Sequence, residues 1–168
     1  MTRKLAILIV SLIMTILPAT VSAAPAQRIF SEISNLPGVE STYIGPAALR
    51  LAGSYIPLDD ASMGGIGSAI KSLKSIEVVE CDNPKSFNKL RKFCDGLVDS
   101  LNLEIIIEST EDDEKTRIFG LVPDGDGTQD GNTLEGLLIE TLEKGEYNLV
   151  FVRGTIDLSK LELNNDNK

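Results

Sequence analysis

The sequence contains no histidine and no tryptophan, and only two of its 168 residues are cysteine. Without imidazole it can form neither a Ser-His-Asp or Cys-His catalytic arrangement nor a zinc site that needs histidine. The chain has fewer basic than acidic residues: 16 Lys and Arg and 25 Asp and Glu, which give a net charge of −9. A nucleic-acid backbone requires a basic face, so we expect no nucleic-acid partner.

Apolar residues make up 42% of the chain, which is enough to build a core and is not typical of a disordered acidic tail. The length fits one domain. We find no motif that specifies a reaction, and we therefore expect a folded protein that is not an enzyme.

The first 23 residues have the pattern of a secretory signal peptide. Arg3 and Lys4 precede an apolar run over Leu5–Leu17, and residues 21–23 (Val-Ser-Ala) supply the small residues of a cleavage site. The alternative is an uncleaved membrane anchor, but a bilayer span needs roughly 20 apolar residues and this run is shorter. We therefore expect a periplasmic or secreted protein with no stable membrane insertion after cleavage.

The two cysteines are predicted to be buried thiols. Cys81 ends a predicted strand, and Asp82-Asn83-Pro84 has the capping side chain and early proline of a helix start. Cys94 then lies about 15 Å along that helix at 1.5 Å per residue, whereas a disulfide needs Cα atoms roughly 5.5 Å apart. A bridge remains the alternative, since an exported protein meets an oxidising compartment.

Periodicity predicts helices in the first part of the chain and strands in the last. The predicted helices are 28–36, 47–52, 66–73 and 84–101, and the predicted strands are 39–44, 76–81, 103–108, 116–122, 134–142 and 147–152. Helix 84–101 has one apolar stripe of 3.6-residue period, formed by Phe87, Leu90, Phe93, Cys94, Leu97, Val98 and Leu101.

This order predicts a two-layer α+β fold, with a largely antiparallel sheet that ends in a C-terminal meander and helices packed on one face. The other face is then open and leaves Glu77, Glu104 and Glu108 in solvent. Residues 149–152 are apolar on both faces, which indicates a central strand. We assign residues 24–161 to a single domain and residues 162–168 to a disordered polar tail.

The loop over residues 124–132 is rich in Asp and Gly and is the one candidate metal site. Asp124, Asp126 and Asp130 would be the ligands of a bound calcium ion, which prefers six to eight oxygens. The match to a twelve-residue calcium loop fails at Gln129, where Gly is required, and at Gly131. A plain hairpin loop is the favoured explanation of the Asp-Gly pairs, and we expect no other cofactor.

Four stretches resemble domain-of-unknown-function family 4252, small secreted proteins known mainly from Bacteroidetes. They are residues 30–44, where Leu36-Pro37-Gly38-Val39 leads into a strand, residues 48–51, residues 73–78 (Leu-Lys-Ser-Ile-Glu-Val), and residues 148–157, where Gly154-Thr155-Ile156 closes the last strand. The resemblance covers about residues 28–161. It implies no activity and no catalytic residue, because none is established for the family.

The favoured interpretation is a non-enzymatic exported envelope protein that acts as a binding module for an unknown envelope protein partner. One alternative is a calcium-binding module that uses the loop at residues 124–132. The other is a histidine-free carboxylate hydrolase, which requires two acids to converge in one pocket.

Overall fold

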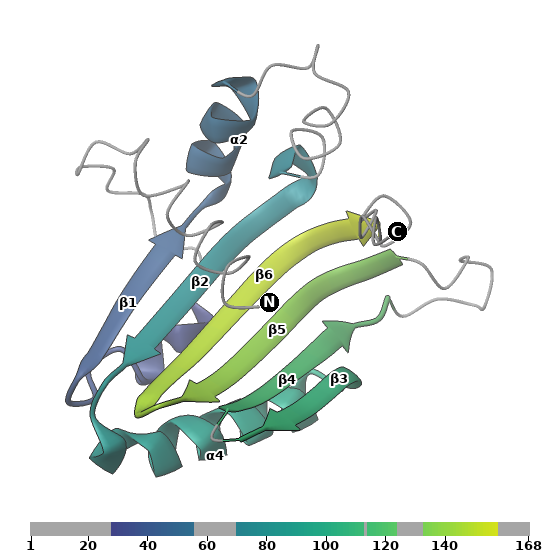
Figure 1. Cartoon of the computed structure of the whole chain (residues 1–168). Helices are drawn as coiled ribbons and strands as arrows, with labels where there is room; N and C mark the ends of the chain where they lie inside the picture. The colour runs from purple at the N-terminus through teal and green to yellow at the C-terminus, as the bar shows by residue number, and fades with distance from the viewer. Residues whose placement is uncertain (1–27, 56–69, 113, 124–132, 158–168) are drawn as a thin grey trace, which may run out of the picture.

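The computed structural model of the protein describes residues 28–55, 70–112, 114–123 and 133–157. Within these ranges the strands form one six-stranded antiparallel sheet in the spatial order β1-β2-β6-β5-β4-β3 (Figure 1). The strands are β1 (Val39–Ile44), β2 (Leu73–Cys81), β3 (Glu104–Glu111), β4 (Glu114–Leu121), β5 (Thr133–Glu143) and β6 (Glu146–Asp157). The helices are the 3-10 helix η1 (Ile29–Glu32), α2 (Pro46–Tyr55) and α4 (Pro84–Ser100). The fold is α+β, as predicted.

Strand β6 is the last strand along the chain but lies inside the sheet, between β2 and β5 (Figure 1). Its alternate residues meet two apolar environments. Leu149 and Phe151 are fully buried in the main core cluster, and Val150 and Val152 pack against a second cluster. Apolar residues on both faces predicted this central position, which is confirmed.

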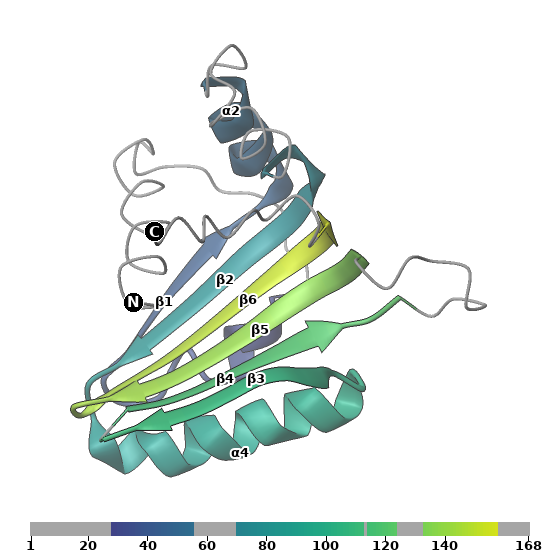
Figure 2. The same ribbon diagram turned by 45° about the vertical axis from the view of Figure 1, so that its right-hand side comes forward.

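Helix α4 lies along one face of the sheet (Figure 2). Asn83 caps its first turn by accepting a hydrogen bond from the backbone N–H of Lys85 at 3.2 Å, and Pro84 occupies the first turn. Leu90 and Cys94 on its apolar stripe are fully buried in the main core cluster. Burial of a side chain of the size of Leu contributes roughly 1.5–3 kcal/mol, so this stripe holds the helix to the sheet.

Helix α2 packs on the opposite face, which corrects the prediction that the helices share one face. Leu49 of α2 is buried with Ile44, Ile76 and Val78. Ile76 and Val78 alternate along β2 with Val79 and Cys81, which belong to the main core cluster. Successive strand residues point to opposite faces, so α2 and α4 lie on opposite sides of the sheet.

The first helical segment is shorter than the predicted helix over residues 28–36. It consists of the four-residue η1, followed by turns in which Leu36 N–H donates to Ile33 O and Val39 N–H donates to Leu36 O. Gly38 ends this segment at a φ of 75°, a conformation that favours glycine. Local periodicity predicted a helical segment here but overestimated its length, and the segment also contacts a distant strand.

That contact is made by Glu77, whose predicted exposure to solvent is wrong. Glu77 is 3% exposed and lies beneath η1. Its carboxylate accepts hydrogen bonds from the backbone N–H groups of Ile29 and Phe30, both at 3.0 Å. A carboxylate satisfies the free N–H groups at the start of a helical turn, so Glu77 fastens η1 to β2. Glu104 and Glu108 are exposed as predicted.

Gly154 interrupts the regular pairing of β6. The register shifts between Leu73 and Ser75 of β2, where Gly154 pairs with Leu73 at a φ of 139°. A Cβ atom at Gly154 would lie 2.5 Å from the Cα of Leu73. Glycine is therefore required at this bulge, which gives a structural reason for the Gly154-Thr155-Ile156 motif.

Cys81 and Cys94 are both buried and free, so the prediction of two thiols is confirmed and the bridge is excluded. The Cys81 thiol donates weakly to the backbone oxygen of Asn83 at 3.7 Å. Among the described residues, no helix is long and apolar enough to cross a membrane. The predicted signal peptide over residues 1–23 and the predicted tail over residues 162–168 lie outside the described residues.

Candidate interaction surface

The sheet face opposite α4 carries its side chains in rows that cross the strands, and we call it the open face. Residues paired across neighbouring antiparallel strands point to the same face, so the register defines each row. One row is polar and contains Glu40, Glu80, Asn148, Thr141, Thr116 and Ser109. Beside it runs the apolar row, which contains Val78, Val150, Ile139, Ile118 and Ile107 and ends at Thr42 on β1.

Helix α2 covers this face at one end only. Leu49 packs on Ile76 and Val78, with Val150 and Val152 against the edge of the same cluster. In both views α2 lies beyond the β1–β2 end of the sheet, and no described helix lies over the open face at β5, β4 and β3 (Figures 1 and 2). The apolar row therefore runs from its α2-covered end into a region that no described helix covers.

Exposure of apolar side chains is greatest at β3. Ile105, Ile106 and Ile107 are 55%, 45% and 49% exposed. The sequence predicts strict alternation here, but Ile105 pairs with Phe119 and Ile107 pairs with Ile118, so Ile106 is an extra residue in a bulge. Ile105 lies on the same face as Phe119 of the main core cluster and Ile107 lies on the open face, so the exposed isoleucines are spread over both faces of this edge strand.

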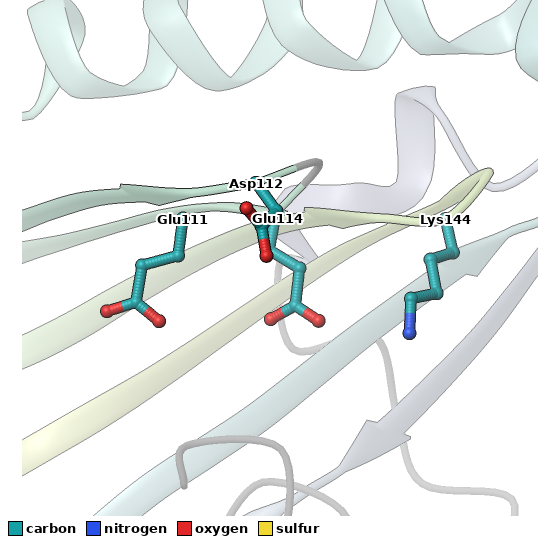
Figure 3. Close-up of a pocket in the computed structure, with 4 residues that line it drawn as sticks. All are labelled: Glu111, Asp112, Glu114 and Lys144. Carbon is teal, nitrogen blue, oxygen red and sulfur yellow. The ribbon is translucent and has the colours of Figure 1, made fainter.

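An acidic corner borders this end of the sheet. The tips of the β3–β4 and β5–β6 hairpins enclose a hollow of about 620 Å³, lined by Glu111, Asp112, Glu114 and Lys144. The side chains of Glu111, Glu114 and Lys144 extend away from α4 (Figure 3). The β3–β4 hairpin tip therefore places a cluster of negative charge at one end of the edge strand β3.

A charged network lies on the other face, between α4 and the sheet. Glu140 of β5 is 3% exposed and accepts hydrogen bonds from Nε of Arg117 and from the hydroxyl of Tyr147. Arg117 also lies 2.8 Å from Oδ1 of Asp95 on α4. The network therefore links α4 to β4, β5 and β6.

Burial and the hydrogen bond to Glu140 raise the pKa of Tyr147, and the hydrogen bond to Glu140 raises the pKa of Arg117. Both donors therefore stay protonated at neutral pH. The sequence analysis missed this network, although Glu140 stands at an inward position between Leu138 and Leu142, where an apolar residue is expected.

Cys94 lies beside this network, and burial together with the negative charge of Glu140 raises the pKa of its thiol from 9.0 to about 12. Between pH 9 and about 12 the unfolded chain loses the thiol proton and the folded chain keeps it. The free energy of unfolding then falls as the pH rises, by about 1.4 kcal/mol per pH unit for one such group.

We expect the unfolding free energy of the protein to fall over this alkaline range and the Cys94→Ala variant to lack that part of the slope. Urea unfolding at pH 8.5, 9.5 and 10 measures it. Tyr147, whose pKa is also raised, adds the same dependence to both proteins near pH 10, so the difference between the two slopes reports Cys94. Equal slopes in the two proteins would contradict the prediction.

The described residues test neither the calcium site nor the hydrolase alternative. Asp124, Asp126 and Asp130 lie outside them, so the calcium site stays a prediction. The part of the chain that the structure describes holds no group of three His, Cys, Asp or Glu side chains arranged to bind a metal. The two buried glutamates, Glu77 and Glu140, each bind donors of the protein itself.

The fold and surface define a small α+β protein with a partly open sheet, and its sequence matches a known family model. The family model described as "Domain of unknown function (DUF4252)" matches residues 32–163, a range that contains all of the strands described above. The chain belongs to this family, which confirms the resemblance seen in the sequence. It has no match among curated proteins or among solved structures.

Proposed function

We propose that this protein is a non-enzymatic binding module of the bacterial cell envelope, exported by its N-terminal segment, which contacts a protein partner through the open face. The observation that carries the proposal is the apolar row that leads from the α2-covered end to the half-exposed Ile107 of β3. Contiguous exposed apolar surface beside polar residues is typical of interaction sites.

The absence of histidine supports the non-enzymatic part of the proposal, as does the use of both buried glutamates as internal acceptors. The pattern of residues 1–23 supports export. A hydrolase screen that found turnover, abolished by one Glu→Gln or Asp→Asn change, would contradict the non-enzymatic part.

Site-directed photo-crosslinking in intact cells tests the proposal. A photoreactive amino acid replaces Thr116 on the open face or, as the matched control, the exposed Lys92 on the outer side of α4. We expect a discrete crosslinked protein in the envelope or secreted fraction from position 116 and none from position 92. The mass of the purified protein should show the loss of residues 1–23.

A second substitution shows whether the crosslink depends on the open face. Ile139→Lys, placed in the apolar row, should abolish it. Thr141→Lys in the neighbouring polar row provides a second disruption in case Ile139→Lys impairs folding. Crosslinks of equal yield from both positions would overturn the binding role, and an intact N-terminus in the cytosolic fraction would overturn export.

A further inference from the structure

Strand β3 is an edge of the described sheet. It pairs with β4 on one side, and none of the described strands pairs with its other side. An edge strand presents a row of backbone N–H and C=O groups that can pair with another strand. Proteins commonly protect such edges against pairing with other chains, for example with a β-bulge. The bulge at Ile106 protects only one part of β3.

The side chains of β3 combine apolar surface with one sign of charge. Three half-exposed isoleucines lie between the exposed Glu104 and Glu108, and Glu111 ends the strand. The strand contains no Lys or Arg. The hairpin tip adds Asp112 and Glu114 at its end. A segment that pairs with this edge must therefore supply apolar side chains opposite the isoleucines and positive charge opposite the acids.

The paired side of β3 already shows this complementarity. In β4, Ile118 and Phe119 lie opposite Ile107 and Ile105. Arg117 lies opposite Glu108, and Lys115 makes a 2.8 Å ion pair with Glu108. This ion pair lowers the pKa of Glu108, and the largest cause is the hydrogen bond from Lys115. The strand that β3 selects within its own chain is thus a basic and apolar one.

We propose that the outer edge of β3 binds an extended segment of a protein partner, apolar at its centre and flanked by Lys or Arg, which adds to the sheet as a further strand. This assignment rests on the proposed binding role and names the chemistry of the partner. In strand addition, main-chain hydrogen bonds supply affinity and alternate side chains supply specificity. Here the isoleucines and the acidic residues of β3 supply the specificity.

Charge argues against a second copy of the chain at this edge. Glu104, Glu108 and Glu111 are spaced along the whole of β3, and no basic residue separates them. Pairing of two β3 strands would bring carboxylates of one copy near those of the other, and like charges on adjacent strands are destabilising. A cationic segment meets no such penalty.

A synthetic peptide with the sequence of residues 115–121 of β4, Lys-Thr-Arg-Ile-Phe-Gly-Leu, is the probe, and its binding to the full folded protein is measured by fluorescence anisotropy. We expect saturable binding and slowed amide exchange in β3. Two further peptides carry N-methyl groups on alternate backbone nitrogens. In a paired strand, only one of the two alternating sets of amides faces β3. The peptide that is methylated on this set should bind at least about tenfold more weakly, because it loses hydrogen bonds of about 1 kcal/mol each. The peptide that is methylated on the other set should keep its affinity.

Two protein variants control for general electrostatic attraction. Glu104→Gln/Glu111→Gln should weaken peptide binding roughly threefold to tenfold, the range for two exposed ion pairs. Glu32→Gln/Asp82→Asn removes the same charge at two exposed positions outside the open face and outside β3, and should leave the affinity within about twofold.

Equal weakening by the two N-methylated peptides, or equal effects of the two variants, would overturn the assignment. Dimerisation in sedimentation experiments that Ile107→Lys abolishes would overturn it in favour of a second copy. If peptide binding fails while the crosslink at position 116 persists, only the edge assignment fails; the loss of both removes the proposed function as well.

Discussion

Replacing Arg117 with methionine is expected to lower the free energy of unfolding by about 3–5 kcal/mol, the range for removal of one partner of a buried ion pair. The change leaves the carboxylate of Glu140, which is 3% exposed, with a hydrogen bond from the Tyr147 hydroxyl but without its cationic partner. It also removes the contact with Asp95 on α4. Urea unfolding at pH 7 measures the effect.

Two controls separate the buried charge from a general loss of charge. Lys115→Met removes the same charge from the same strand, but its ion pair with Glu108 is exposed and should cost less than about 1 kcal/mol. The double variant Arg117→Met/Glu140→Gln should recover much of the loss, because a neutral amide still accepts a hydrogen bond from Tyr147. A cost at position 117 no larger than that at position 115 would contradict this account.

Replacing Glu77 with alanine is expected to destabilise the protein by about 2–4 kcal/mol. The carboxylate satisfies the N–H groups of Ile29 and Phe30, and each buried donor left without an acceptor costs roughly 1–3 kcal/mol. Urea unfolding measures the loss. Amide exchange should also become faster at Ile29 and Phe30, because η1 would no longer be held to β2.

Glu80→Ala is the matched control, since Glu80 lies on the same strand and is exposed. Its effect should stay within about 0.5 kcal/mol, as for most surface substitutions. Glu77→Gln should fall between the two, because the amide has one oxygen acceptor where the carboxylate has two. Unchanged exchange at η1 in the Glu77→Ala variant would show that other contacts hold this segment.

Elements with strong local signals could be predicted from the sequence. Strand β1 has the predicted bounds Val39–Ile44, and α4 begins at Pro84 as the Asn83 cap indicates. The central place of β6 followed from apolar residues on both of its faces. These features depend on neighbours a few residues away, and periodicity and capping report such neighbours directly.

The features that the sequence analysis missed depend on distant partners. Glu77 meets Phe30 across 47 residues, and Arg117 meets Glu140 across 23. The alternation of apolar and polar residues predicted that Glu77 faces solvent, because such alternation carries no information about which segment covers that face. The bulge at Ile106 and the placement of α2 opposite α4 follow from pairing and packing between separate elements, and single-sequence patterns do not report these.

The insertion of β6 between β2 and β5 also determines when the chain can finish folding. Until residues 146–157 pair, the β1–β2 pair and the β3–β5 strands have no hydrogen-bonded connection through the sheet. Contacts such as Ile76 with Val152 close a loop of many residues, which slows folding. Pairing of the final strand is thus the event that allows the two halves to join.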